Sequence, residues 1–240
     1  MKLTFHGTRG EIEARTELHD MHTCCEVAYR GKGVTIDCGT DWREELDRLN
    51  PQALVITHGH PDHVDGLRDG APCPVWATDQ TWEIIGGWDI PERHVVEHRE
   101  PFEVRGIRFE AFPVVHSTRA PAVGYRVSAG VVTIFYVPDL VYIEDRQAAL
   151  RGAKAYVGDG ATIEKSFVRK PGDTLIGHTP VRTQLTWCQK EGVPLAVVNH
   201  CGSQIVEAKP EEVEARIEAL AEERGVEVKI AYDGMELVLR

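Results

Sequence analysis

The alternation of apolar and polar positions predicts many short strands with helices between and after them. Runs rich in Val, Ile, Tyr and Phe predict strands. These runs lie at residues 24–29, 33–37, 53–57, 107–115, 123–128 and 131–137. Helix-like stretches lie at 42–49, 79–86, 144–151, 181–191 and 210–224. This order favours an α/β fold with two sheets in the middle and helices outside.

Length and composition agree with one packed unit. The chain has 240 residues and 42% apolar residues, enough for a sizeable core, so we expect residues 1–240 to form a single domain. No apolar run approaches the roughly 18 residues of a membrane span. The first seven residues are too short and too polar for a signal peptide, so we expect a cytoplasmic protein without membrane association.

The most informative segment is His58-Gly59-His60-Pro61-Asp62-His63, directly after the apolar run Ala53–Ile56. It places three imidazoles and a carboxylate within six positions. Zinc prefers imidazole nitrogen and carboxylate oxygen. A His-rich surface loop has no reason to follow a buried strand, so the segment predicts a metal site.

The same pattern, a polar residue ending an apolar run, occurs at His116, Asp139 and His200. One such residue alone is usually a turn or capping residue. Three of them, together with the His-rich segment, predict further ligands at the same rim of the fold.

These residues, in this order, resemble the metallo-β-lactamase superfamily. Asp37, in Val34–Gly39, matches an aspartate that orients the metal loop in that family and binds no metal. The resemblance covers nearly the whole chain and implies a four-layer αββα sandwich with the site at one edge. It implies ligands for two divalent metals: His58, His60 and His116 for one, Asp62, His63 and His200 for the other, and Asp139 between them.

The two-metal arrangement has a physical reason. Dications roughly 3.5–4 Å apart need a shared anion, which a carboxylate supplies and an imidazole does not. A hydroxide between the metals would be the nucleophile, because metal binding moves the pKa of water to about 7. We expect Zn²⁺, although Mn²⁺ or Fe would suit the same ligand types.

Other motifs resemble the ribonuclease Z-like phosphodiesterases of this superfamily. They are His6–Gly10, His116–Arg126 and Gly177-His178-Thr179, with a looser match at Gly158–Thr162. The resemblance implies that His178 contacts the scissile phosphate and that Asp159 supports it. Such a reaction needs charge stabilisation and a proton for the leaving oxygen. The structural alternative is that His178 caps the helix near Pro180 and that Asp159 lies in a turn.

We therefore expect a dinuclear metal-dependent phosphodiesterase or nuclease, with Asp62, His178 and Asp159 as its catalytic residues. Asp62 is both a metal ligand and a candidate proton acceptor. The formal net charge of −11 argues against a long polyanion and leaves a small phosphodiester or short nucleic acid as substrate. The alternatives are a glyoxalase II-like thioester or lactam hydrolase, and a non-catalytic metal-stabilised binding protein. The resemblance also allows a homodimer.

Several other residues carry weaker expectations. Arg9 and Arg119 are candidate phosphate binders. His19 and His22 either line the pocket or are ordinary loop residues. We expect Cys38 and Cys201 to be packing residues, since no C-x₂-C pair occurs. We expect Trp42 to be partly exposed.

Overall fold

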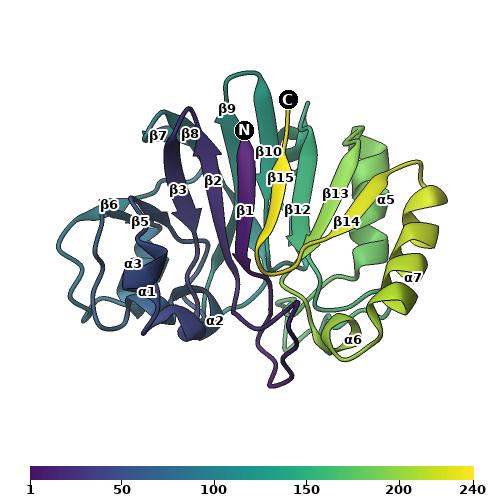
Figure 1. The fold of residues 1–240 in the computed structure, drawn as a ribbon, viewed down its shortest axis with the longest axis horizontal. Coiled ribbons are helices and arrows are strands. Elements are labelled where there is room, and N and C mark those ends of the chain that lie inside the picture. Colours follow the sequence, from purple (N-terminus) through teal and green to yellow (C-terminus); the bar gives the residue numbers. More distant parts are fainter.

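Two β-sheets stacked face to face, with helices on both outer sides, make up the computed structural model of residues 1–240 (Figure 1). This confirms the expected αββα sandwich. No helix is long and apolar enough to cross a membrane.

The first sheet contains both ends of the chain and has seven strands. In spatial order they are β15 (Met235–Val238), β1 (Lys2–Gly7), β2 (Cys24–Tyr29), β3 (Lys32–Ile36), β4 (Leu54–Val55), β5 (Val75–Ala77) and β6 (Arg93–Val95). The neighbours from β15 to β3 pair antiparallel, and those from β3 to β6 pair parallel.

The second sheet is formed by the later part of the chain. In spatial order its strands are β11 (Tyr142–Ile143), β8 (Ile107–Val115), β9 (Ala122–Ala129), β10 (Val132–Tyr136), β12 (Ala155–Asp159), β13 (Leu195–Asn199) and β14 (Glu227–Ile230), with β7 (Phe102–Val104) paired to β8. Strands β10, β12, β13 and β14 run parallel, so their carboxyl ends meet at one edge.

Helices cover the outer face of each sheet. Beside the first sheet lie η1 (Thr40–Trp42), α1 (Leu46–Leu49), α2 (Pro61–Val64), η2 (Asp65–Leu67) and α3 (Asp79–Ile84). On the other side lie α4 (Arg146–Leu150), α5 (Val181–Glu191), α6 (Ser203–Val206) and α7 (Pro210–Glu222). In Figure 1, α2 and α6 lie at the same lower end of the sandwich.

The main core lies between the sheets. Phe5 and Ile36 from the first sheet and Phe109 and Tyr125 from the second are fully buried in one apolar cluster. Two hydrogen bonds also join the sheets where the His-rich segment begins. The Tyr125 hydroxyl donates to the carbonyl of Ile56 (2.8 Å), and the backbone N–H of Val123 donates to the carbonyl of Thr57 (3.1 Å). The His-rich segment therefore starts from a point that both sheets hold in place.

The sequence predictions match most of these elements. The strand predicted at 24–29 is β2, and the helices predicted at 181–191 and 210–224 are α5 and α7, the latter two residues shorter. The helix predicted at 42–49 is wrong in part, because this stretch holds only the end of η1, a turn and the single turn α1. The prediction of an exposed Trp42 is also wrong. Trp42 is 5% exposed, and its Nε1–H donates to the carbonyl of His22.

Phe109 offers a test of the core between the sheets. Replacing it with Ala should destabilise the protein by about 3–5 kcal/mol, since a fully buried ring is lost and a cavity remains. Val131 is 90% exposed, so Val131→Ala should change stability by less than about 0.5 kcal/mol. Urea unfolding at matched metal content measures both. Equal effects of the two substitutions would contradict this description of the core.

Candidate metal centre

Strand ends and one short helix deliver the predicted ligands to one edge of the sandwich. His116 follows β8, Asp139 lies three residues beyond β10, and His200 follows β13. His60 is in extended conformation, and Pro61 then starts α2. The short helix turns Asp62 and His63 back toward the strand ends, where both are buried.

The first group of donors consists of His58, His60 and His116 together with Asp139. The Nδ1 atom of His60 lies 3.1 Å from Nε2 of His58 and 3.2 Å from Nε2 of His116. Asp139 Oδ2 lies 3.3 Å from His58 Nε2 and 3.4 Å from His116 Nε2. Three ring nitrogens and one carboxylate oxygen thus converge on one place.

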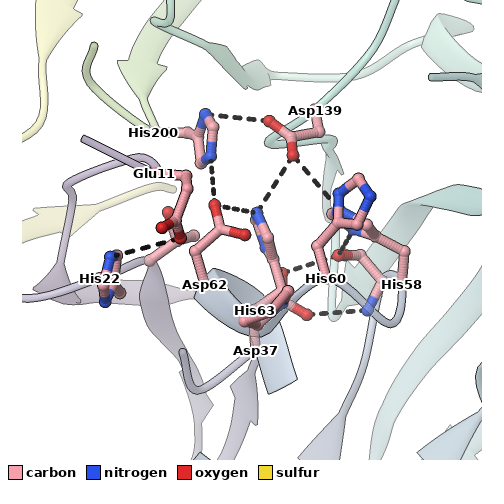
Figure 2. A network of polar contacts seen from close by, with 12 residues as sticks. Glu11, His22, Asp37, His58, His60, Asp62, His63, Asp139 and His200 are labelled. Atoms are coloured by element: carbon pink, nitrogen blue, oxygen red, sulfur yellow. Dashed lines mark hydrogen bonds and ion pairs between the residues drawn. The ribbon is translucent and has the colours of Figure 1, made fainter. Parts of the chain in front are cut away.

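The second group consists of Asp62, His63 and His200, again with Asp139. Asp62 Oδ2 lies 3.0 Å from His200 Nε2 and 3.4 Å from His63 Nε2. Asp139 Oδ2 lies 3.2 Å from His63 Nε2, and its Oδ1 lies 2.9 Å from His200 Nδ1. Figure 2 shows Asp139 between the two groups, facing His58 and His63 on one side and His200 on the other.

Asp37 fixes which ring nitrogens face the centre. Its Oδ2 accepts hydrogen bonds from His63 Nδ1 (2.9 Å) and from the hydroxyl of Thr57 (2.8 Å). Because that hydroxyl donates to Asp37, it accepts from His58 Nδ1 at 3.0 Å. His116 Nδ1 donates likewise to the carbonyl of Gly177 (3.2 Å). All three histidines therefore direct Nε2 at the centre, an orientation typical of metal-binding imidazoles.

The backbone is strained at two of these positions. Asp37 and His200 adopt positive φ angles of 60° and 51°, which are uncommon for residues with a side chain. A close approach also requires glycine at position 39, since a Cβ there would lie 2.0 Å from the carbonyl oxygen of Asp62. The fold holds these conformations where they aim side chains at the centre.

The residues present fit a divalent cation. His63 Nε2, Asp139 Oδ1 and His200 Nδ1 are buried and make no well-oriented hydrogen bond, although each lies close to another donor atom of the cluster. Buried polar atoms left unsatisfied are costly, and a cation would satisfy all three. A set of imidazole nitrogens and carboxylate oxygens suits Zn²⁺, Mn²⁺ or Fe.

The two groups differ in charge before any cation binds. Burial lowers the pKa of His58, His60 and His116, that of His60 to about 4, so these rings are neutral and offer lone pairs. Burial also opposes charge on His63 and His200, but the nearby carboxylates of Asp62 and Asp139 outweigh it and raise their pKa well above the usual value. A cation binding at the second group would therefore displace protons.

Asp139 itself is held as an anion. Burial alone would raise the pKa of its carboxyl, but His200, His116 and His63 around it hold that pKa well below its usual range. A negative charge is thus available between the two groups.

His178 and Asp159 form a pair beside this cluster. The Nδ1 of His178 lies 2.9 Å from Oδ2 of Asp159, which also accepts from the backbone N–H of Leu140. The expected pairing is present, and α5 is not capped by a His178 side chain. Burial lowers the pKa of His178, but the carboxylates of Asp159 and Asp139 outweigh it and raise this pKa to about 8.

Gln184 on α5 hydrogen-bonds to the two segments that carry this pair. This residue was not identified from the sequence. Its side-chain oxygen accepts from the backbone N–H of Asp159 (2.9 Å), and its Nε2 donates to the carbonyls of Asp159 and Thr179. It therefore fixes the distance between the two segments that carry Asp159 and His178. The signal that could have identified it is a polar glutamine on the buried face of the predicted helix.

A pocket of about 630 Å³ opens onto the cluster. Its walls include His60, Asp62, His116, Asp139, His178 and His200, which all lie among the predicted site residues. They also include Glu11, Phe167, Ser203 and Gln204, which sequence reasoning did not single out. Phe167 is 42% exposed, and Glu11 lies in a loop. Neither belongs to a periodic apolar pattern that would have pointed to it in the sequence.

The weaker candidates lie outside this pocket. Arg9 is 1% exposed and paired with Asp41, so it cannot reach a substrate phosphate. Arg119 is exposed but does not line the pocket. His19 and His22 are buried and do not line it. Cys38 and Cys201 are buried thiols in apolar clusters, as expected of packing residues.

Comparison with known families decides where the chain belongs. Residues 33–201, which contain the whole candidate ligand set, match the model of the β-lactamase superfamily domain. The chain belongs to this superfamily. The resemblance seen in the ligand motifs is thereby confirmed.

Curated relatives within the superfamily share part of the chain. Exodeoxyribonuclease WalJ of Streptococcus pneumoniae is 28% identical over 116 residues, 45% of this chain and 41% of WalJ. Exodeoxyribonuclease YycJ of Bacillus anthracis is 26% identical over 121 residues, 47% of this chain and 46% of YycJ. The match spans less than half the length of these relatives.

Solved structures share the fold over the whole chain. The metallo-β-lactamase fold protein YhfI of Bacillus subtilis has a TM-score of 0.78 at 15% identity, covering 98% of both chains. A diphosphatase of the PhnP family has 0.72 at 22% identity, covering 100% of this chain and 98% of its own. The short form of human tRNase Z has 0.65 at 16% identity, covering 100% of both. At these identities the likeness establishes the superfamily fold.

Asp37 provides a test of how the centre is oriented. Asp37→Asn keeps a residue that tolerates positive φ but removes the charge and one acceptor from the contacts to His63 and Thr57. Metal affinity should fall about 10–100-fold, although Asp37 touches no metal position. Competition with a coloured chelator measures the affinity.

The matched control is Asp69→Asn, which removes an exposed pair with Arg43 and should leave affinity unchanged. Unchanged affinity in the Asp37 variant would contradict the orienting role.

Proposed function

We propose that the protein is a dinuclear metal-dependent phosphodiesterase acting on a small phosphodiester or a short nucleic acid. The observation that carries the proposal is the His178–Asp159 pair: Asp159 holds Nδ1 of His178, and His178 lines the same pocket as members of both ligand groups that share Asp139. Metal ligands alone would suit many hydrolases. A histidine held by a carboxylate beside them supplies the additional donor that a phosphodiester requires.

The ligand groups would hold two divalent cations: His58, His60 and His116 one, Asp62, His63 and His200 the other, with Asp139 shared. Bound there, two cations lower the pKa of water and neutralise charge on phosphate oxygens. Zn²⁺ is our first assignment, with Mn²⁺ or Fe accepted by the same donors. Asp62, buried on the first turn of α2, lies where it can also accept a proton.

His178 would act through its second ring nitrogen. Its Nδ1 is held by Asp159, and Asp159 is fixed by Leu140, by Ala161 and by Gln184, so the ring has one orientation. Nδ1–H donates to Asp159, so Nε2 carries a proton in the charged form of the ring, which a pKa of about 8 makes available near neutral pH. That Nε2–H can donate to a phosphate oxygen or give its proton to the leaving oxygen. The curated relatives named as exodeoxyribonucleases support a phosphodiester as the bond that is cleaved.

Replacing His178 tests its role. His178→Asn should lower kcat for bis(p-nitrophenyl) phosphate about 100-fold or more while metal content stays the same, because the donor is lost and the ligands remain. His98 is exposed and does not line the pocket, so His98→Asn should behave as wild type. Activity of the His178 variant within about threefold of wild type would rule out the assigned role.

Metal removal tests the dinuclear proposal and its alternatives together. Dialysis against a chelator should abolish diester hydrolysis, and adding back about two equivalents of Zn²⁺ or Mn²⁺ per chain should restore it. S-lactoylglutathione and nitrocefin are the competing substrates. Strong turnover of either without diester hydrolysis would favour the thioester or lactam hydrolase. Metal uptake without any turnover would favour a metal-stabilised binding protein.

A further inference from the structure

The pocket above the centre has an unusual charge distribution for a protein that acts on phosphate esters. Fifteen residues line it, and none of them is lysine or arginine. Apart from the ligand cluster and His178, its one charged wall residue is the glutamate Glu11. Proteins that hold polynucleotides contact many phosphates with lysine and arginine. These walls offer no such contact to phosphates beyond the reacting one.

The backbone on both sides of Glu11 is held against the ligand cluster, while its side chain is 71% exposed to the pocket and solvent. The N–H of Gly10 donates to the carbonyl of Cys201 (3.0 Å), next to His200. Gly10 also packs on the His200 ring so closely that a Cβ there would lie 2.9 Å from Cε1. The N–H of Ile12 then turns back to the carbonyl of Gly10 (2.8 Å). The Glu11 side chain therefore leaves the backbone directly beside a ligand.

A buried histidine faces the Glu11 carboxylate. The side chain of His22 is 8% exposed, its Nδ1 lies 2.6 Å from Asp41 Oδ2, and its Nε2 has no hydrogen-bond partner. That Nε2 lies 3.8 Å from Oε2 of Glu11. Figure 2 shows Glu11 above His22 and beside Asp62. Asp41 is in turn paired with Arg9 and Arg15. These pairs hold the His22 ring in place next to the Glu11 carboxylate.

We propose that Glu11 is a specificity-determining residue that restricts the pocket to phosphodiesters with a single negative charge and a hydroxyl or amino donor beside the reacting phosphate. The inference rests on the proposed phosphodiesterase function and narrows its substrate class. The carboxylate accepts a hydrogen bond from the donor and repels a second phosphate placed there. Exposed Phe167, whose N–H donates to the carbonyl of His178, offers a face for an aromatic base on another wall.

The test compares three p-nitrophenyl substrates with metal-loaded wild type, Glu11→Gln and the control Glu13→Gln. Glu13 is exposed and does not line the pocket. The substrates are bis(p-nitrophenyl) phosphate, the p-nitrophenyl ester of thymidine 5′-phosphate, and the same ester with its 3′-hydroxyl phosphorylated. The second carries one charge and a free hydroxyl, whereas the third carries extra charge in place of that hydroxyl.

Glu11→Gln should raise kcat/KM for the 3′-phosphorylated ester about tenfold relative to the 3′-hydroxyl ester, the size expected for like charges several ångströms apart. Glu13→Gln should leave this ratio within about twofold of wild type. An unchanged ratio in Glu11→Gln, or one common factor for all three substrates, would overturn the inference alone. No hydrolysis of any diester by wild type would overturn the proposed function and this inference with it.

Discussion

The carboxylate of Asp139 is buried among imidazoles from two sides, and it belongs to every group of donors at the centre. A negative charge at such depth is costly unless positive charge compensates it. The surrounding histidines hold its pKa low, but its Oδ1 makes no well-oriented hydrogen bond, although His200 Nδ1 lies 2.9 Å away. The arrangement is therefore incomplete without cations. The sandwich, the parallel strand ends and the strained backbone at Asp37 and His200 all converge on this one group.

The layered fold explains how the orientation of the ligand side chains is set. The His-rich segment starts between two sheets that are hydrogen-bonded to each other at Ile56 and Thr57. Asp37, directly after β3, then orients the ring of His63 by a direct hydrogen bond and that of His58 through Thr57. Ligand orientation thus derives from the packed sheets, while the pocket walls derive from loops. We therefore attribute the precise ligand positions to the packed sheets and the proposed substrate selectivity to the loops.

The layers of the fold and the candidate ligand residues could both be predicted from the sequence, because both depend on strong local signals. Apolar strands followed at once by His or Asp are visible in the chain itself, and the parallel ends of β10 and β13 bring Asp139 and His200 together. Trp42 and Arg9 were misjudged because tertiary packing buries them among loops that have no period. Glu11 and Gln184 carry no motif. Their importance comes from contacts with segments distant in sequence, which no local pattern encodes.

The most direct measurement is the position of metal in a crystal of the metal-loaded protein, located by anomalous scattering at the metal's absorption edge. The account predicts two peaks about 3.5–4 Å apart. One should lie against His58, His60 and His116, and the other against Asp62, His63 and His200, with an Asp139 oxygen within bonding distance of both. A single peak, or two peaks of which Asp139 touches only one, would contradict the shared carboxylate.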